Sequence, residues 1–125
     1  MKSFCQKVDK EFITGVWKVV KIEKVSNSPY FKDLIKSFGS SIFTFSENGK
    51  VEIITKNKTK LFSMLIKEAN DSNWKLERQN EVKIGSQFNN FSIMIIKVNI
   101  SYDEIFFDLG EEAQFPLVLK VEKIK

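Results

Sequence analysis

The chain has 125 residues, enough for one domain with a substantial hydrophobic core. It contains 12 phenylalanines, one cysteine and no histidine, which excludes histidine-based triads, histidine metal sites and an internal disulfide. The formal net charge is +4, but the lysines are spread among acidic residues and Arg78 is the single arginine, so we expect no nucleic-acid binding.

Short alternating segments separated by turn residues predict an all-β chain. The expected strands cover 12–25, 40–47, 50–57, 59–68, 73–78, 81–86, 90–100, 103–109 and 115–124. In the first of them, Trp17 and Val19 share one face, whereas Val20 and Ile22 share the other. A β-bulge or bend at this break would let a long first strand help to close a barrel.

One short helix is expected between the first two strands. Ser28 is a suitable N-cap, Pro29 fits the first helical position, and Gly39 fits the C-terminal stop. A single apolar stripe recurs at i, i+3, i+4 and i+7, formed by Phe31, Leu34, Ile35 and Phe38. Since so short a helix is not stable alone, the stripe must dock on an apolar surface such as the mouth of a barrel.

Three turns are expected to join neighbouring strands. Asn48-Gly49 is the strongest hairpin signal in the chain, because both residues tolerate positive φ. Further turns are expected at Gln79-Asn80 and across 101–103. Together these features predict a single antiparallel up-and-down β-barrel of about eight to ten strands over 12–125, after a flexible N-terminal segment, 1–11.

The ordered series of motifs resembles the small bacterial lipocalin-like domains of the calycin superfamily. The resemblance begins with Gly15-x-Trp17 and continues through the "FTFSENGKVEI" and "WKLERQNEVKI" segments to the terminal "LVLKVEKI". It implies a barrel with an apolar interior that often binds a small hydrophobic ligand. It also implies that Trp17 closes the base of the barrel, with Lys120 or Lys123 over its ring as a cation–π partner.

The residues expected to line the barrel are large and apolar. If a cavity exists, a fatty acid or other lipid-like molecule would contact Phe31, Leu34, Ile35, Phe38, Phe43, Phe45, Ile53, Trp74, Leu76, Phe91 and Phe107. The helix over 29–38 would then act as a lid. The alternative is that these side chains fill the barrel themselves, as they do in small barrels of about eight strands.

Arg78 has two interpretations. It shares parity with Trp74 and Leu76, so it would point inward and pair with a ligand carboxylate, or it lies exposed beside a hairpin turn. The acidic residues near 103–112 are read as a solvated loop. No nucleophile motif or metal-ligand spacing is present, and no cofactor or enzymatic activity is expected.

Two functions follow from these patterns. The first is a non-enzymatic, monomeric lipocalin-like domain that binds a small hydrophobic ligand. The second is a filled barrel that binds a protein partner, such as an inhibitor or immunity protein. No apolar run is long enough for a transmembrane segment, and a cytoplasmic location is expected. A periplasmic or membrane-anchored lipoprotein is the alternative if a signal sequence ending before Cys5 has been removed.

Overall fold

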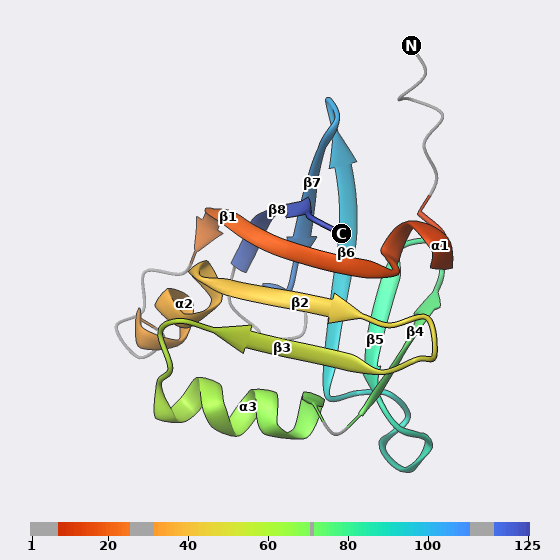
Figure 1. The fold of residues 1–125 in the computed structure, drawn as a ribbon, viewed down its shortest axis with the longest axis horizontal. Helices are drawn as coiled ribbons and strands as arrows, with labels where there is room; N and C mark the ends of the chain where they lie inside the picture. Colours follow the sequence, from red (N-terminus) through yellow and green to blue (C-terminus); the bar gives the residue numbers. More distant parts are fainter. Residues whose placement is uncertain (1–7, 26–31, 71, 111–116) are drawn as a thin grey trace.

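The computed structural model describes residues 8–25, 32–70, 72–110 and 117–125. Eight antiparallel strands form one sheet in the order β3-β2-β1-β8-β7-β6-β5-β4 (Figure 1). The strands are β1 (Gly15–Val25), β2 (Ser41–Phe45), β3 (Val51–Thr55), β4 (Asn73–Glu77), β5 (Glu81–Gly85), β6 (Met94–Ser101), β7 (Glu104–Asp108) and β8 (Leu117–Lys123). The first strand pairs with the last, and the two edge strands meet at one end, so the sheet forms the nearly closed antiparallel barrel that the sequence predicts.

The barrel has a seam between its two edge strands, β3 and β4. They are joined at one end by the isolated bridge between Lys50 and Asn73, where the Trp74 N–H donates to the Gly49 carbonyl at 2.9 Å. The helix α3 (Lys60–Asn70) connects these strands and packs against β3 along the seam (Figure 1). The ladder that would close the barrel is therefore replaced over much of its length by a helix.

The prediction of a strand over 59–68 is wrong, since these residues lie in α3. Its inward residues, Phe62, Leu65, Ile66 and Ala69, recur at the helical spacing i, i+3, i+4 and i+7. The side chain of Thr59 caps the helix by accepting a hydrogen bond from the Phe62 N–H at 3.3 Å. The periodicity and the cap outweigh the β-branched and aromatic content that favoured a strand.

Two further α-helices precede strands. α1 (Lys10–Ile13) starts inside the segment expected to be a flexible extension, and the Asp9 side chain caps it by accepting from the Phe12 N–H at 2.8 Å. α2 (Lys32–Gly39) lies between β1 and β2 in the chain, where a helix was expected, and Gly39 is its last residue. Its predicted start at Ser28 and Pro29 lies outside the described residues. A 3₁₀ turn, η3 (Gln87–Asn89), follows β5.

The irregularities of the sheet lie close to where the sequence places them. The register between β1 and β8 shifts between Val19 and Lys21, which confirms the bulge in the first strand; Val20 is the extra residue and is exposed. Gly49 has a φ of +92° in the predicted β2–β3 hairpin. The β6–β7 turn is formed by Tyr102 and Asp103, both with positive φ.

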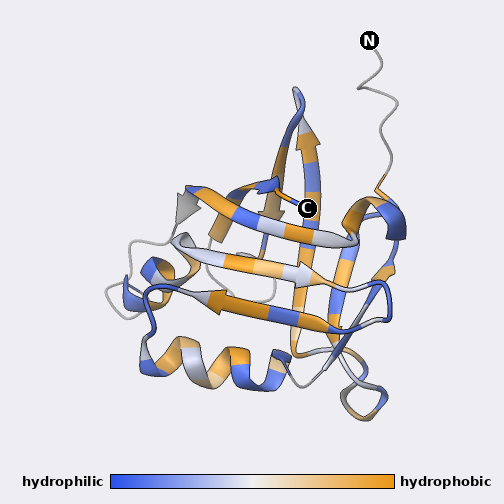
Figure 2. Cartoon of the chain, in the orientation of Figure 1, coloured by the Kyte–Doolittle hydropathy of each residue, from blue (hydrophilic) through white to orange (hydrophobic). Residues whose placement is uncertain are grey.

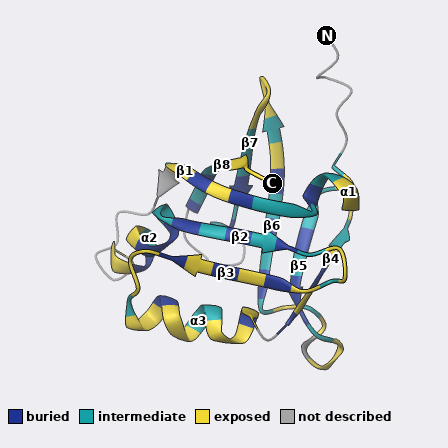
Figure 3. Cartoon of the chain, viewed as in Figure 1, coloured by how far each residue is buried: buried dark blue, intermediate teal, exposed yellow. Residues whose placement is uncertain are grey.

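One hydrophobic core occupies the inside of the barrel. The strands alternate between hydrophobic and hydrophilic residues (Figure 2), and the buried positions recur at every second residue (Figure 3). In β3, for example, Val51, Ile53 and Thr55 are buried while the residues between them are exposed. This period of two places one face of each strand inside and leaves the other in water.

Candidate functional site

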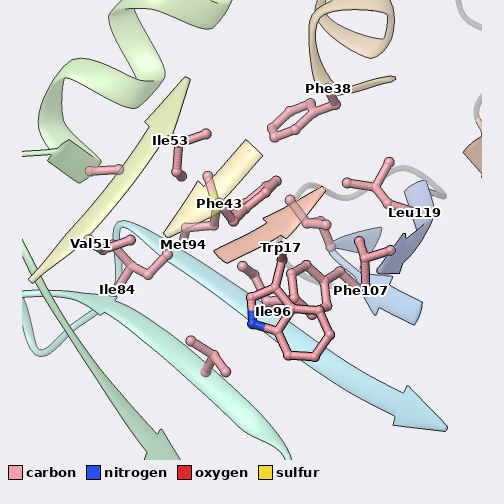
Figure 4. Close-up of a cluster of buried hydrophobic side chains, with 14 of the residues drawn as sticks. Trp17, Phe38, Phe43, Val51, Ile53, Ile84, Met94, Ile96, Phe107 and Leu119 are labelled. Carbon is pink, nitrogen blue, oxygen red and sulfur yellow. The ribbon is translucent and has the colours of Figure 1, made fainter. Parts of the chain in front are cut away.

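Aromatic rings that contact one another run across the barrel interior (Figure 4). The ring centroid of Phe107 lies 5.4 Å from that of Trp17, 5.6 Å from that of Phe43 and 6.3 Å from that of Phe45. Phe45 in turn lies 5.4 Å from Trp74. These centroid separations are those of directly packed aromatic pairs. The rings of Phe107 and its neighbours therefore leave no layer between them for a second molecule.

Aliphatic side chains surround the aromatic rings. Figure 4 shows Ile53, Ile84 and Ile96 pointing toward the rings from different strands. The largest fully buried side chains are those of Trp17, Phe38, Phe43, Phe45, Phe62, Phe107, Ile13, Ile53, Ile84, Ile96, Leu117 and Leu119. Within the described residues, no buried side-chain nitrogen or oxygen lacks a hydrogen-bond partner. The described part of the interior therefore has no unpaired buried polar side chain that could bind the head group of a ligand.

The helices α2 and α3 pack against each other and contribute side chains to the core. The Phe38 ring meets Phe62 of α3 edge-to-face, with a centroid separation of 4.9 Å, and stacks on Phe43 at 6.4 Å. Leu34 is buried and Ile35 is half-buried against the core. The apolar stripe of α2 thus docks on the barrel, as the sequence predicts for its described members.

Hydroxyl groups fasten this helical cover in place. The Ser37 hydroxyl of α2 lies within hydrogen-bond distance of the Asn57 carbonyl and 3.1 Å from the Thr59 hydroxyl. The Thr55 hydroxyl donates to the Ser37 carbonyl at 2.6 Å and lies 2.9 Å from that of Ser40. Because Ser37 is fully buried, lifting α2 would break several hydrogen bonds at once.

Trp17 is fully buried near the start of β1, next to α1. Its indole N–H donates to the Ile13 carbonyl at 2.8 Å, which ties β1 to α1. The Lys123 ammonium lies 5.6 Å from the Trp17 ring centroid and donates to the Phe12 carbonyl at 2.8 Å. Of the two lysines that the resemblance places over Trp17, Lys123 is therefore the one found there. Lys120 instead pairs with Glu104 at 2.7 Å, a contact that raises the pKa of Lys120.

Gly15, two residues before Trp17, occupies a position that only a glycine fits. Its φ is +141°, and a Cβ at this position would lie 2.4 Å from the Lys125 carbonyl oxygen and 2.6 Å from the Lys123 side chain. The neighbouring Val16 N–H donates to the same Lys125 carbonyl at 3.1 Å. The close approach of the C-terminal strand to β1 therefore requires a residue without a side chain.

Most of the predicted lining residues do face the interior. The buried ones are Leu34, Phe38, Phe43, Phe45, Ile53, Trp74 and Phe107, and the half-buried ones are Ile35 and Leu76. Phe31 lies outside the described residues. The predicted lining residues that are described therefore lie together inside the barrel, with the two exceptions below, and pack against one another.

Two of the predicted lining residues lie elsewhere. Arg78 is exposed at the β4–β5 turn, where it and Gln79 have positive φ values of 50° and 73°, so the inward orientation considered for it is wrong. Phe91 is not in a strand but in the turn before β6, with a φ of 55°, and its ring lies under the Lys75 ammonium at 4.4 Å. Since Lys75 is on the outer face of β4, Phe91 lies outside the barrel.

The turn before β6 also shifts the phase of that strand by one residue. Met94, Ile96 and Val98 are buried, whereas the alternate positions, which share the parity of Phe91, are not. The polar residues Lys97 and Asn99 in the alternate positions were the available signal for this phase. Phe62 and Ala69 were also missed as core residues, because α3 was read as a strand.

The outer surface carries charged pairs and one prominent aromatic side chain. Lys75 and Lys83 both pair with Glu77, at 2.7 and 3.0 Å, and these contacts lower the pKa of Glu77 to about 2. Phe88 is fully exposed in η3. A surface depression of about 430 Å³ is lined by Lys10, Glu11, Thr14 and Glu47. Among the described residues, no group of three acidic or cysteine side chains is arranged to hold a metal.

No described helix is both long and apolar enough to cross a membrane. No protein-family model, curated protein or solved structure matches the chain.

Proposed function

We propose that this chain is a non-enzymatic, filled-barrel module that binds a protein partner through its outer surface, in the manner of an inhibitor or immunity protein. The observation that carries the proposal is the set of direct contacts from the Phe107 ring to Trp17, Phe43 and Phe45. Rings packed in this way act as a rigid scaffold. A lipid-sized ligand would have to displace them, at the cost of the packing that holds the core together.

The buried polar groups and the helical cover support the same proposal. Known small-molecule sites combine an apolar wall with a few convergent polar groups that fix the ligand. Here the buried hydroxyls of Ser37 and Thr55 form hydrogen bonds with other groups of this chain instead. These bonds hold α2 onto the barrel. The apolar interior that suggested a ligand site from sequence is used for packing.

The β5–β6 loop offers an anchor for a protein partner. It is a hydrogen-bonded loop, since the Phe91 N–H donates to the Ser86 carbonyl at 2.9 Å and the Phe91 ring lies under Lys75. Within this loop Phe88 is left fully exposed. A large aromatic side chain presented by a constrained loop is the kind of residue that supplies much of the binding energy in protein interfaces.

The interior half of the proposal is tested by native mass spectrometry and by titration with a fluorescent fatty acid. We expect the mass of the chain alone and no saturable uptake of the fatty acid. A mass increment from one bound lipid, or saturable binding at one fatty acid per chain, would show that the barrel is a container. The ligand-binding function predicted from the sequence would then be the correct one.

The partner half is tested by a photo-crosslinking amino acid placed at position 88, with a second variant that carries it at position 99 as the control. Asn99 is exposed on β6 and lies away from the loop. In cells that express the chain, we expect one stoichiometric protein adduct from position 88 and none from 99. A Phe88→Ser variant should lose the partner while keeping the stability of the parent. Equal crosslinking from both positions, or full partner binding by Phe88→Ser, would contradict the role of this loop.

A further inference from the structure

The exposed face of α3 and the loop before it carry four lysines. Lys56 and Lys58 lie in the loop after β3, and Lys60 and Lys67 lie on α3; all four are exposed. The chain has 20 basic and 16 acidic residues, so these four lysines equal its whole formal excess of +4. No acidic residue lies between Glu52 and Glu68. Glu68, which is exposed beside Lys67 on α3, offsets one of these charges, and the four lysines still give this edge of the molecule a net positive charge.

Some lysines on the strands are compensated by carboxylates, although Lys18 of β1 forms no ion pair within the described residues. Lys21, Lys75, Lys83 and Lys120 each pair with a carboxylate. None of the four lysines around α3 forms an ion pair within the described part of the chain. Their charge is therefore available to an anionic partner.

Apolar side chains lie between these lysines on the helix. At 100° per residue, Lys60, Met64 and Lys67 occupy the crest opposite the buried residues Phe62 and Ala69. Met64 is 62% exposed, and the neighbouring Leu61 is 48% exposed. In Figure 3 the face of α3 that points away from the barrel is largely exposed, and α3 forms an outer edge of the molecule. We call this surface, made of Lys56, Lys58, Lys60, Leu61, Met64 and Lys67, the α3 lysine face.

We propose that the α3 lysine face docks the protein on the surface of an anionic lipid bilayer. Lysines beside exposed apolar side chains on one helical face are the combination that places a helix in the headgroup region. The ammonium groups meet anionic headgroups while Met64 and Leu61 enter the acyl boundary. A nucleic acid would use the lysines but would gain little from these two apolar side chains, whereas a bilayer accommodates both kinds of group. The inference concerns a surface distinct from the barrel interior and from Phe88, so it does not rest on the proposed function.

The size of the effect follows from the number of lysines. Each lysine near an anionic bilayer strengthens binding about fivefold, so loss of two should weaken it about 25-fold. Four lysines and two partly exposed apolar side chains give weak, reversible association. It should require anionic lipid and should decrease as salt shortens the range of the electrostatic attraction.

The test is vesicle co-sedimentation of the full chain. One set of vesicles is phosphatidylcholine alone, and in the other about a third of the lipid is phosphatidylserine. We expect binding only to the anionic vesicles at low salt. The double variant Lys60→Gln/Lys67→Gln should bind about 25-fold more weakly. The control Lys18→Gln/Lys125→Gln, which lowers the net charge equally on exposed residues elsewhere, should bind as the parent does.

A second variant tests the apolar part of the face. In Met64→Trp, the introduced indole should shift its fluorescence to the blue on anionic vesicles, while Trp17 and Trp74, which are 0% and 5% exposed, contribute a constant background. Circular dichroism checks that each variant is folded. The proposal fails if the parent does not bind anionic vesicles at low salt, or if the two double variants bind equally. It also fails if Met64→Trp binds without a blue shift, which would mark the face as a general site for polyanions such as nucleic acid or acidic protein.

Discussion

The side-chain amide of Asn70 makes two hydrogen bonds to the main chain of Ile53. The Ile53 N–H donates to Asn70 Oδ1 at 2.6 Å, and Asn70 Nδ2 donates to the Ile53 carbonyl at 3.2 Å. The pair of bonds is the one that a neighbouring strand would make to the open edge of β3. The last residue of α3 thus takes the place of a missing strand partner at the seam of the barrel.

Replacing Asn70 should weaken the seam. We expect Asn70→Ala to lower the free energy of unfolding by about 1–2 kcal/mol, because both main-chain groups of Ile53 lose their partner while alanine favours the helix slightly. Urea denaturation followed by circular dichroism measures the change. Lys67→Ala on the exposed face of the same helix is the control and should stay within about 0.5 kcal/mol of the parent. Equal stabilities of the two variants would mean that the seam does not depend on Asn70.

Removing the charge over Trp17 should lower the stability of the fold. Lys123→Met keeps the length of the side chain but loses both the cation–π contact and the hydrogen bond to the Phe12 carbonyl. We expect a loss of about 1–2 kcal/mol in the free energy of unfolding, measured by thermal or urea denaturation. Lys123→Arg should retain most of the stability. Lys18→Met, on the exposed face of β1, is the matched control. A variant at 123 as stable as this control would contradict the role given to Lys123.

Two of the glycines with positive φ, Gly15 and Gly49, should respond differently to alanine. At Gly15 a Cβ would overlap the Lys125 carbonyl oxygen, whereas at Gly49 no atom lies within 4 Å. We expect Gly49→Ala to cost about 1 kcal/mol from its backbone conformation alone, and Gly15→Ala to cost at least about 3 kcal/mol because the main chain must also move. Comparison of their urea midpoints tests this order, and the reverse order would contradict the packing of β1 against the C-terminal strand.

The carboxylate of Glu77 should titrate far below the usual range. Hydrogen bonds from Lys75 and Lys83 lower its pKa from an ordinary value of 4.5 to about 2. Because the pKa of Glu77 is lower in the folded state, its ion pairs with Lys75 and Lys83 stabilise the fold above pH 4.5. This contribution is lost as the pH falls toward 2. NMR titration of the side-chain carboxyl carbon reads the pKa directly. In Glu77→Gln, the loss of stability between neutral and acidic pH should be smaller, and a Glu77 pKa near 4.5 would refute the arrangement.

Period-two alternation and turn chemistry were enough to predict most of the barrel. The Asn48-Gly49 hairpin, the break after Val19 and the strand containing Trp74 all depend on local patterns, and each is found where the sequence places it. α2 could also be predicted from a local pattern, because its apolar stripe repeats at helical spacing.

The errors arose where a short segment fits two periods or where a turn resets the phase. Residues 59–68 are rich enough in apolar side chains to suggest a strand, and only the spacing from Phe62 to Ala69 shows the helix. The positive φ of Phe91 turns the chain before β6 and reverses which residues face inward. The sequence also could not predict whether the interior is filled or open. Whether Phe43, Phe45 and Phe107 pack together depends on how far the barrel closes.

The most direct test of a filled barrel is binding of a small apolar molecule to the parent and to Phe107→Ala. Phe107 is fully buried among Trp17, Phe43 and Phe45, so removing its ring should leave an apolar cavity of the kind that binds benzene. Benzene binding, followed by NMR shifts of the core methyl groups, should be absent in the parent and appear in Phe107→Ala, with a loss of about 3–5 kcal/mol in stability. Saturable benzene binding by the parent, equal to that of the variant, would show that the barrel already holds an empty space and would contradict the account.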